Sequence, residues 1–395
     1  MTEPVTTYVW PGETRVGFGA AGLAGKEAKK RGASHAFIVT DPGVMAAGLL
    51  EPVTASLAEA SLPYTLFGGV VPNPDAASVD GAAAACRQCG ADLIIGLGGG
   101  SALDTAKGVR LLVGGPPEAG IAEYALILRG KRRPAPAVCD MPPMFAIPTT
   151  AGTASEVTPW AVITDPDTHF KFAVGGAFLI PTAALVDPEL TLTLPPHLTA
   201  ATGLDALSHA VEAYVSTNAA PAVDALLLDA IERVGRSLRV AVSQGSDRRA
   251  RYDMALASYM AGVGFSTRWL GACHSLAHQL SGFANVHHGT AIALMLPHQM
   301  AYSLPGAPER YARIAAALNP ADPPSGPVAG RAEAAVERVR RLIADVGLPA
   351  RLRDVGITEA MLPAMAANAY RDLSWTTNPR PVDEAALEQI FRRAW

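Results

Sequence analysis

Histidines and one aspartate recur at spacings that suit metal binding. Asp205 and His209 stand four residues apart in a segment with a helical pattern, and His274 and His278 repeat that spacing. Side chains at i and i+4 share one helix face, with Cβ atoms roughly 5–6 Å apart. With His287–His288, five of the nine histidines belong to this group. A carboxylate with three imidazoles suits Fe²⁺ or Zn²⁺. The alternative is a set of core histidines that bind no metal, and spacing alone does not choose the ligands.

A glycine-rich turn in the first half of the chain is typical of a phosphate site. Asp92–Leu97 predicts a buried strand, Gly98–Ser101 follows it, and Ala102–Leu112 predicts a helix. Backbone N–H groups at a helix N-terminus bind anions, and glycines let a phosphate approach the backbone closely. A tight structural turn is the alternative, because short glycine motifs are weak evidence by themselves.

Two further polar segments follow predicted strands. Asp41 comes after His35–Thr40, where a carboxylate can bind a ribose 2′-hydroxyl and repel a 2′-phosphate. An Asp-Pro-Gly turn explains the same residues equally well. The hydroxyl-rich segment Pro148–Ser155 follows the apolar run Met144–Ile147. It suits contacts with a cofactor, although a loop that caps the next element is the alternative.

The elements around these segments change type half-way along the chain. Apolar runs alternate with helical patterns in the first half, which predicts a parallel sheet covered on both faces, with a small hairpin over Ala161–Val174. The predicted strands are His35–Thr40, Tyr64–Phe67, Asp92–Leu97, Met144–Ile147 and Ala184–Asp187, and the predicted helices between them are Pro42–Ala60 and Asp75–Gly90.

The second half carries helical patterns and no convincing strand after Thr199. The predicted helices are Thr202–Val215, Ala219–Ser243, Arg248–Phe265, Gly271–Ser281, Arg331–Val346, Thr358–Ala369 and Asp383–Ala394. We therefore expect an α/β domain over residues 1–194 and an all-helical domain over residues 195–395.

Composition excludes several classes of protein. A chain of 395 residues with 49% hydrophobic and 17% charged residues can form a large core. A net charge of −4 without a basic stripe argues against nucleic-acid binding. The chain has no apolar run of membrane-spanning length and no signal-peptide pattern, so we expect a cytoplasmic protein with no membrane partner. The four cysteines are expected to be reduced thiols.

Several motifs in order resemble the iron-containing (group III) alcohol dehydrogenase family, over a stretch from about Pro11 to the C-terminus. They are Gly98–Ser101 with Asp104 and Lys107, the segment Thr149–Glu156, Gly203–Tyr214, and His274–Gly289. The resemblance implies an N-terminal dinucleotide-binding domain, a C-terminal helical metal-binding domain and an active site in the cleft between them.

The resemblance also implies a role for individual residues. The implied metal ligands are Asp205, His209, His274 and His288, and His278 would lie beside the metal and relay a proton. The implied cofactor contacts are Asp41, Asn73, Gly98, Gly99, Gly100, Ser101, Thr149, Thr150, Thr153 and Lys171. His287 is expected to be a solvated neighbour.

Three bulky residues depart from what the resemblance leads one to expect near the substrate. They are Trp160, Arg268 and Trp269, and they argue against a simple short-chain alcohol as substrate. Arg268 suits an anionic substrate group because a guanidinium pairs with carboxylates. A structural arginine is the alternative.

Together these features predict an oxidoreductase that moves a hydride between NAD(H) and an alcohol, aldehyde or ketone, with Fe²⁺ or, as the second choice, Zn²⁺ polarising the substrate oxygen. We expect NAD(H) to be preferred because of Asp41, and a homo-oligomer, dimer or larger. The alternatives are a metalloenzyme similar to dehydroquinate synthase or glycerol dehydrogenase, a metal-dependent hydrolase, or a non-catalytic binding protein.

Overall fold

Two compact units make up the chain. The computed structural model describes residues 6–126, 132–165, 171–218 and 220–395. The first unit, called the sheet unit here, comprises residues 11–150 and 154–193. The second, the helical unit, comprises the residues up to Trp10, residues 151–153 and residues 194–395. The single division expected between residues 194 and 195 did not include the first two of these segments in the helical unit. One contact from each segment shows why they belong there: the Val9 N–H donates to Thr267 Oγ1 at 3.0 Å, and Gly152 O lies 3.2 Å from His209 Nδ1.

A six-stranded, all-parallel sheet forms the centre of the sheet unit, in the order β1-β8-β5-β4-β2-β3. The strands are β1 (Glu13–Val16), β2 (Ala36–Val39), β3 (Tyr64–Phe67), β4 (Leu93–Gly98), β5 (Met144–Pro148) and β8 (Ala183–Val186). All five predicted strands are present. Parallel pairing sets their carboxyl ends along one edge. After β2 the chain adds β3 on one side, and after β4 it adds β5 and β8 on the other, so the strand order switches between β2 and β4, where such sheets bind ligands.

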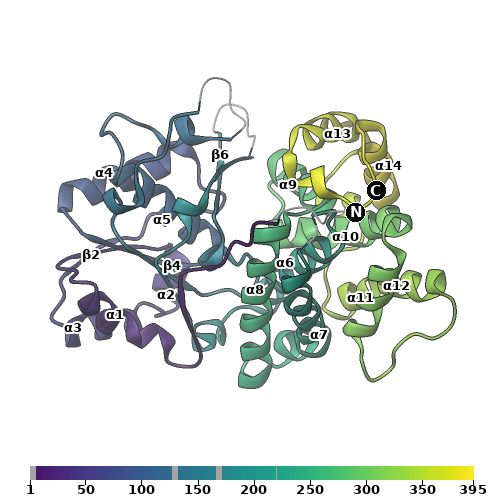
Figure 1. Cartoon of the computed structure of the whole chain (residues 1–395), viewed down its shortest axis with the longest axis horizontal. Helices are drawn as coiled ribbons and strands as arrows, with labels where there is room; N and C mark the ends of the chain where they lie inside the picture. The colour runs from purple at the N-terminus through teal and green to yellow at the C-terminus, as the bar shows by residue number, and fades with distance from the viewer. Residues whose placement is uncertain (1–5, 127–131, 166–170, 219) are drawn as a thin grey trace. The chain divides into compact units, whose positions relative to one another are not determined.

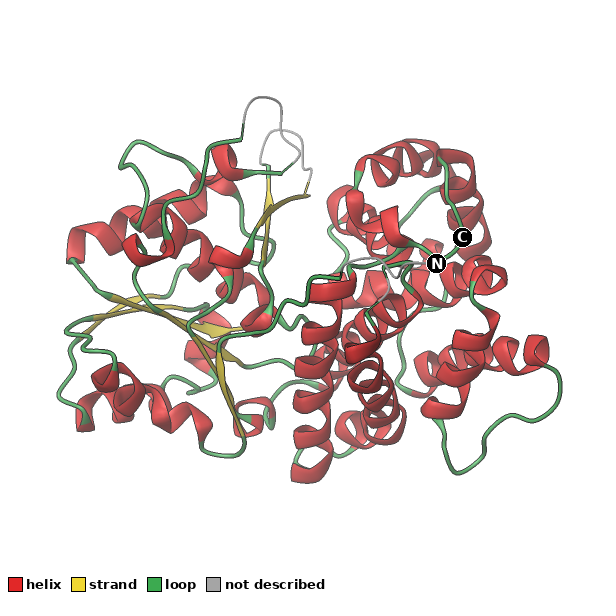
Figure 2. Cartoon of the chain, in the orientation of Figure 1, coloured by secondary structure: helices red, strands yellow, loops and turns green. Residues whose placement is uncertain are grey.

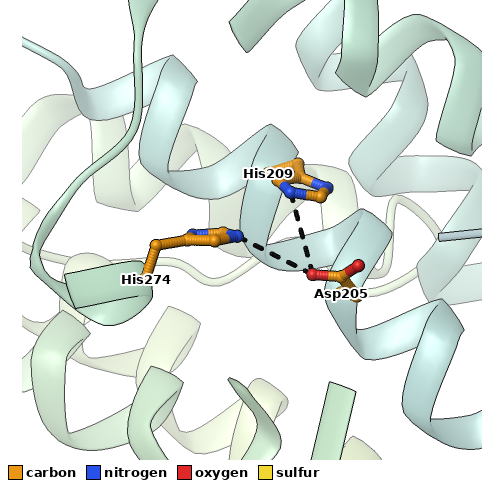
Figure 3. A group of neighbouring side chains, drawn as sticks. All are labelled: Asp205, His209 and His274. Carbon is orange, nitrogen blue, oxygen red and sulfur yellow. Dashed lines mark ion pairs between the residues drawn. The ribbon is translucent and has the colours of Figure 1, made fainter. Parts of the chain in front are cut away.

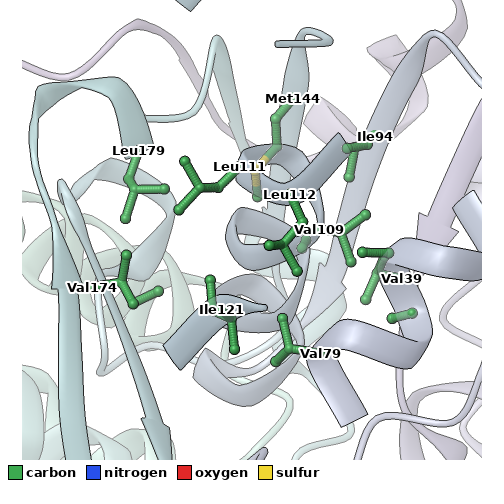
Figure 4. Close-up of a cluster of buried hydrophobic side chains, with 14 of the residues drawn as sticks. Val39, Val79, Ile94, Val109, Leu111, Leu112, Ile121, Met144, Val174 and Leu179 are labelled. Atoms are coloured by element: carbon green, nitrogen blue, oxygen red, sulfur yellow. The ribbon is translucent and has the colours of Figure 1, made fainter. Parts of the chain in front are cut away.

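Helices cover both faces of the sheet (Figure 2). Successive residues of each central strand face opposite sides, and each side has its own hydrophobic core. Val39, Ile94 and Met144 pack on one side with α4 (Ala76–Cys89) and α5 (Gly100–Val113), as Figure 4 shows. Ile38 and Ile95 pack on the other side with α1 (Ala24–Lys30) and α3 (Glu51–Glu59). Because both faces are covered, the four inner strands β2, β4, β5 and β8 consist of almost continuous apolar residues.

The helical unit is built around α6 (Pro196–Val215), which is buried at every position from Thr199 to Val215. This helix packs against α7, α8 and α10 (Figure 1). The other helices are α7 (Pro221–Ser243), α8 (Arg248–Arg268), α9 (Ala272–Ala284), α10 (His288–Ser303), α11 (Pro308–Leu318), α12 (Val328–Asp345), α13 (Leu362–Arg371) and α14 (Glu384–Ala394). No helix in the described ranges is both long and apolar enough to cross a membrane.

The structure differs from the sequence prediction at several elements. The helix expected over Pro42–Ala60 is two helices, α2 (Pro42–Ala46) and α3, because Gly48 between them takes a left-handed φ of 71°. Strand β1 was not predicted, since its sequence ETRV has no apolar run. Helices α10 and α11 were also missed. Helix α10 is buried on nearly all sides and contains Pro297, so it shows no amphipathic pattern.

The predicted hairpin is present as β6 (Trp160–Thr164) paired antiparallel with β7 (Lys171–Gly175). Residues 166–170 of its expected turn lie outside the described residues.

Buried charges on α5 attach this helix to the segment that leads into the hairpin. The carboxylate of Asp104 accepts hydrogen bonds from Ser155 Oγ at 2.6 Å and from the Val162 N–H at 2.9 Å. One turn further on, Lys107 Nζ donates to Thr158 O at 2.9 Å and to Thr158 Oγ1 at 3.2 Å. Because the Asp104 carboxylate and the Lys107 ammonium both form hydrogen bonds with this segment, they can be buried without a large penalty.

Glu156 lies within the same buried region. Burial raises the pKa of its carboxyl to about 7, although the nearby Lys107 ammonium opposes this shift. Burial lowers the pKa of Lys107 to about 8, against the effect of the Asp104 and Glu156 carboxylates. Both groups therefore titrate close to neutral pH in the folded protein.

Glu156→Gln tests this pH dependence. The folded-state pKa of about 7 exceeds the ordinary value of 4.5, so the folded state holds the proton more tightly and the stabilisation is lost as pH rises through 7. We expect the thermal midpoint of E156Q, relative to wild type, to rise between about pH 4.5 and about pH 7, the ordinary and the folded-state pKa of that carboxyl, and to change little above pH 7. Glu59→Gln, an exposed change on α3, is the control. Equal pH responses in E156Q and wild type would contradict the assignment.

Candidate metal centre and cofactor site

Three histidine rings surround one carboxylate oxygen inside the helical unit. Helix α6 carries Asp205 and His209, α9 carries His274, and α10 begins at His288. Asp205 Oδ1 lies 3.7 Å from His209 Nε2, 3.7 Å from His274 Nε2 and 3.5 Å from His288 Nε2. Figure 3 shows the first three side chains pointing toward one another. The structure thus brings together all four predicted ligands.

The geometry fits a metal ion better than hydrogen bonding. Asp205 Oδ1 and His274 Nε2 are both buried and have no hydrogen-bond partner, which is unusual for buried polar atoms. Separations of 3.5–3.7 Å are long for hydrogen bonds. Two atoms bound tetrahedrally to one ion at about 2.1 Å would lie about 3.4 Å apart. Asp205, His209 and His274 offer ligand atoms within 4.8 Å of one another, and this donor set suits divalent iron or zinc.

The carboxylates of Asp205 and Glu212 attract positive charge into the cluster. Burial alone would raise the pKa of Asp205, but His209 and His288 hold it well below its usual value. Burial lowers the pKa of His209 to about 4, so its imidazole is neutral at pH 7. Burial also acts to lower the pKa of His274, yet the Glu212 and Asp205 carboxylates raise it to about 9. A cation that binds His274 must therefore displace a proton.

Further polar groups orient two of these rings. His274 Nδ1 hydrogen-bonds to Glu212 Oε2, and Glu212 Oε1 accepts from the Cys273 N–H at 2.7 Å. His209 Nδ1 lies 3.2 Å from the carbonyl oxygen of Gly152. In both rings Nε2 therefore faces Asp205. Sequence reasoning did not assign a role to Glu212, although its position seven residues after Asp205 places it on the same helix face.

Two glycines allow the backbone to approach α6 closely. A Cβ added at Gly152 would lie 2.6 Å from Thr202 O, and one added at Gly289 would lie 2.2 Å from Ala201 O. Gly289 follows His288 directly, so its close contact with α6 places the first turn of α10 next to Asp205.

His278 has a different partner. Its Nδ1 lies 2.6 Å from Asp372 Oδ2, and its ring stacks on that of His288 with centroids 5.3 Å apart. Burial alone would raise the pKa of Asp372, but the bonds from His278 and Ser374 lower it to about 2. His278 therefore lies beside two of the predicted ligands, His274 and His288. Its partner Asp372 was not singled out in the sequence.

Seven of the predicted cofactor residues lie at the carboxyl ends of β2, β4 and β5: Asp41, Gly98, Gly99, Gly100, Ser101, Thr149 and Thr150. Asp41 caps α2 through its Oδ1, which accepts from the Val44 N–H at 3.0 Å. Its Oδ2 would lie 3.1 Å from a Cβ added at Gly98. Asp41 can therefore be both a turn residue and a ribose-binding residue. Its Oδ1 forms the hydrogen bond of the turn, and its Oδ2 lies beside the glycine-rich segment.

The glycine-rich segment forms the start of α5. Gly99 is the N-cap residue and provides no side-chain cap for the first turn of the helix, which begins at Gly100 and Ser101. Gly98 takes a φ of 151°, and its carbonyl accepts from the Thr149 N–H at 3.0 Å. A Cβ at Gly99 would lie 3.5 Å from Thr150 Cγ2. The glycine-rich turn and the hydroxyl-rich segment Pro148–Ser155 are thus adjacent.

The remaining cofactor candidates divide between the units. Lys171 Nζ, on β7, donates to Asn73 Oδ1 at 2.8 Å, and Asn73 takes a left-handed φ of 53°. A left-handed conformation at a non-glycine residue often marks a functional position. Thr153 groups with the helical unit.

The chain matches two family models. Residues 11–188 match the model "Iron-containing alcohol dehydrogenase", and residues 199–395 match the model for the C-terminal part of the iron-containing alcohol dehydrogenase family. The chain belongs to the iron-containing alcohol dehydrogenase family. It is a metal-dependent oxidoreductase of the alcohol and aldehyde class, so the hydrolase and non-catalytic alternatives are not retained.

Relatives match along essentially the whole chain. The 1,3-propanediol dehydrogenase of Citrobacter freundii is 38% identical over 100% of both chains. A crystal structure of a 1,3-propanediol oxidoreductase aligns with a TM-score of 0.93 and 37% identity, covering 99% of this chain and 100% of that one. The sulfoacetaldehyde reductase of Bifidobacterium kashiwanohense, solved in complex with NAD⁺, aligns with a TM-score of 0.87 and 26% identity, covering 99% of each chain.

The contacts of Arg268 favour its structural alternative over substrate binding. This side chain is buried to 1% exposure. Its guanidinium pairs with Asp224 Oδ1 at 2.6 Å and donates to Ser216 O at 3.0 Å. A cation that is already paired inside the helical unit has little capacity to bind an anionic substrate group.

The two tryptophans are only partly buried. Trp160 packs its ring over Gly175, where an added Cβ would lie 1.9 Å from Cζ3, and its carbonyl accepts from Lys107 Nζ at 2.6 Å. Trp269 ends α8 with a φ of 68°, and its indole N–H donates to Leu373 O at 3.1 Å. Leu373 follows Asp372, the hydrogen-bond partner of His278, so Trp269 contacts the segment that carries Asp372.

Glu212→Gln tests the role of the Glu212 carboxylate. An amide can still accept from the Cys273 N–H but no longer supplies the negative charge that strengthens His274 as a ligand. We expect metal affinity to fall about 10–100-fold, measured by equilibrium dialysis with metal analysis. Glu333→Gln, an exposed change on α12, is the control. Wild-type affinity in E212Q would show that Glu212 does not act on the metal.

Proposed function

We propose that Asp205, His209, His274 and His288 hold one Fe²⁺ ion and that the enzyme transfers a hydride between NAD(H) and an alcohol or aldehyde. The observation that carries this proposal is the convergence of three imidazole nitrogens on Asp205 Oδ1, at 3.5–3.7 Å. The bound metal supplies Lewis-acid polarisation of the substrate oxygen, and the nicotinamide carries the hydride. Zn²⁺ fits the same donor set and is the alternative metal.

The sheet unit supplies the groups that suit the dinucleotide. The uncapped first turn of α5, at Gly99, Gly100 and Ser101, offers backbone N–H groups to the pyrophosphate. Gly98, Thr149 and Thr150 lie beside this turn. The NAD⁺ complex of the sulfoacetaldehyde reductase supports the choice of NAD(H), and we assign further contacts to Asn73, Thr153 and Lys171.

Asp41 would set the preference for NAD(H). Its Oδ2 lies beside Gly98 at the carboxyl end of β4, where it can accept from a ribose hydroxyl and repel the phosphate of NADP(H). His278 would move the proton that accompanies hydride transfer, because its ring stacks on the ring of His288. The cytoplasmic location and the homo-oligomer expected from the sequence stay predictions.

Metal removal tests the proposed centre. We expect chelation to abolish NADH oxidation with an aldehyde panel, followed at the absorbance of NADH, and anaerobic Fe²⁺ to restore it. Zn²⁺ in a parallel sample distinguishes the two metals. An Asp205→Asn variant should not recover with either ion, because the central charged ligand is missing. Full activity of the metal-free enzyme would contradict the proposal.

The cofactor preference is tested by Asp41→Gly. Two unit charges about 4 Å apart interact by about 1–4 kcal/mol near a protein surface. We therefore expect the kcat/KM ratio of NADPH to NADH to rise about tenfold or more, since tenfold corresponds to about 1.4 kcal/mol. Asp383→Gly removes a comparable helix cap on α14 and serves as the control. An unchanged ratio in D41G would refute the assigned role.

A further inference from the structure

The carboxylate of Asp372 is held by three groups on two segments. This residue follows α13 and caps the short helix η10 (Leu373–Thr377). Its Oδ1 accepts from the Ser374 N–H at 2.8 Å and from Ser275 Oγ at 3.4 Å. Its Oδ2 lies 2.6 Å from His278 Nδ1. With 8% exposure the residue is buried, so the position of both oxygens is fixed by these bonds.

The segment that carries Asp372 is fastened to the start of α9. Trp375 N–H donates to Ser275 Oγ at 3.1 Å, and Thr377 Oγ1 donates to Leu270 O at 2.6 Å. Ser275 stands three residues before His278, on the same side of α9. It therefore links the helix that carries the histidine to the segment that carries the carboxylate.

These bonds determine what the imidazole of His278 can do. A carboxylate only accepts hydrogen bonds, so Nδ1 must be the protonated nitrogen of a neutral ring. The ring is stacked on His288, at an interplanar angle of 26°, and meets His274 edge-on, at 75°. Both neighbours belong to the cluster around Asp205. Nε2 is the nitrogen that remains to exchange a proton with a bound molecule.

We propose that Asp372 is the positioning residue for His278: it selects the Nδ1–H tautomer and the ring orientation, and so leaves Nε2 as the proton acceptor. The inference rests on the proposed function in so far as His278 moves a proton there. During alcohol oxidation the substrate hydroxyl proton passes to Nε2, and Asp372 stabilises the resulting imidazolium, as a buried carboxylate does beside other catalytic histidines. Aldehyde reduction returns that proton.

The tautomer is measured directly by ¹⁵N NMR of histidine-labelled protein, metal-free and loaded with diamagnetic Zn²⁺. His278→Gln assigns the signal by its disappearance. We expect wild type to show Nδ1–H with an unprotonated Nε2. Asp372→Asn should shift the population toward Nε2–H, because the amide can present its NH₂ group to Nδ1. Asp247→Asn, which removes the charge from the cap of α8, is the control and should leave the signal unchanged.

Kinetics separate positioning from a structural effect. We expect Asp372→Asn to lower kcat by about 10²-fold or more with KM and metal content nearly unchanged, within the range that acid–base catalysis contributes. The double variant with His278→Gln should lose no more than His278→Gln alone, since the carboxylate acts through the histidine.

Each outcome is decisive. An Nε2–H tautomer in the wild-type protein overturns the proposal without any Asp372 variant, so poor folding of D372N does not prevent the test. Additive kinetic losses, or a fall in kcat matched by loss of metal, also overturn it. Wild-type kcat in His278→Gln would instead refute the proton role of His278, while the NMR measurement still tests the tautomer.

Discussion

The buried carboxylate of Asp205 constrains how the helices of the helical unit pack around α6. Asp205 is 2% exposed, on a helix that is buried along most of its length. An ionised group at such a place is costly unless opposite charge or a cation compensates it. Histidines from α9 and α10 must therefore come within reach of α6, and the backbone contact at Gly289 is what allows α10 to do so. If these residues hold the proposed metal, packing of the helices and metal binding are coupled.

The hydrogen-bond partner of each imidazole distinguishes the proposed ligands His209 and His274 from His278. His209 and His274 each engage an acceptor through Nδ1, Gly152 O and Glu212 respectively, and each turns Nε2 toward Asp205. His278 also engages an acceptor through Nδ1, but that acceptor is Asp372. Identical side-chain chemistry thus serves two purposes. The difference comes from which carboxylate each ring lies beside.

In the sheet unit, the parallel arrangement of the strands determines which polar residues lie together. Its strands are all parallel, so residues that follow β2, β4 and β5 meet at one edge although they lie far apart in the chain. Asp41, Gly98 and Thr149 illustrate this, with the Thr149 N–H bonded to Gly98 O. Ser155 Oγ and the Val162 N–H donate buried hydrogen bonds to Asp104, which connect α5 to the segment after β5. The glycine-rich turn is therefore held by the Thr149 bond at its start and by the Asp104 bonds of the helix that follows it.

Much of this protein follows from local sequence pattern. Apolar runs and glycine turns predicted five strands of the sheet, and the spacing of Asp205 with His209 placed both on one helix face, because strand and helix periods act over a few residues. Strand β1 and helix α10 have no such pattern, since one is polar and the other is buried all round.

The choice among five histidines is not local either. Spacing left it open, and resemblance to a family rather than physics named His288. Only the tertiary structure places His288 Nε2 3.5 Å from Asp205 Oδ1, gives His278 to Asp372 and pairs Arg268 with Asp224. The partners in these contacts lie between 44 and 94 residues apart in the chain. They exist because helix packing and backbone contacts bring them together, and no short-range pattern encodes that.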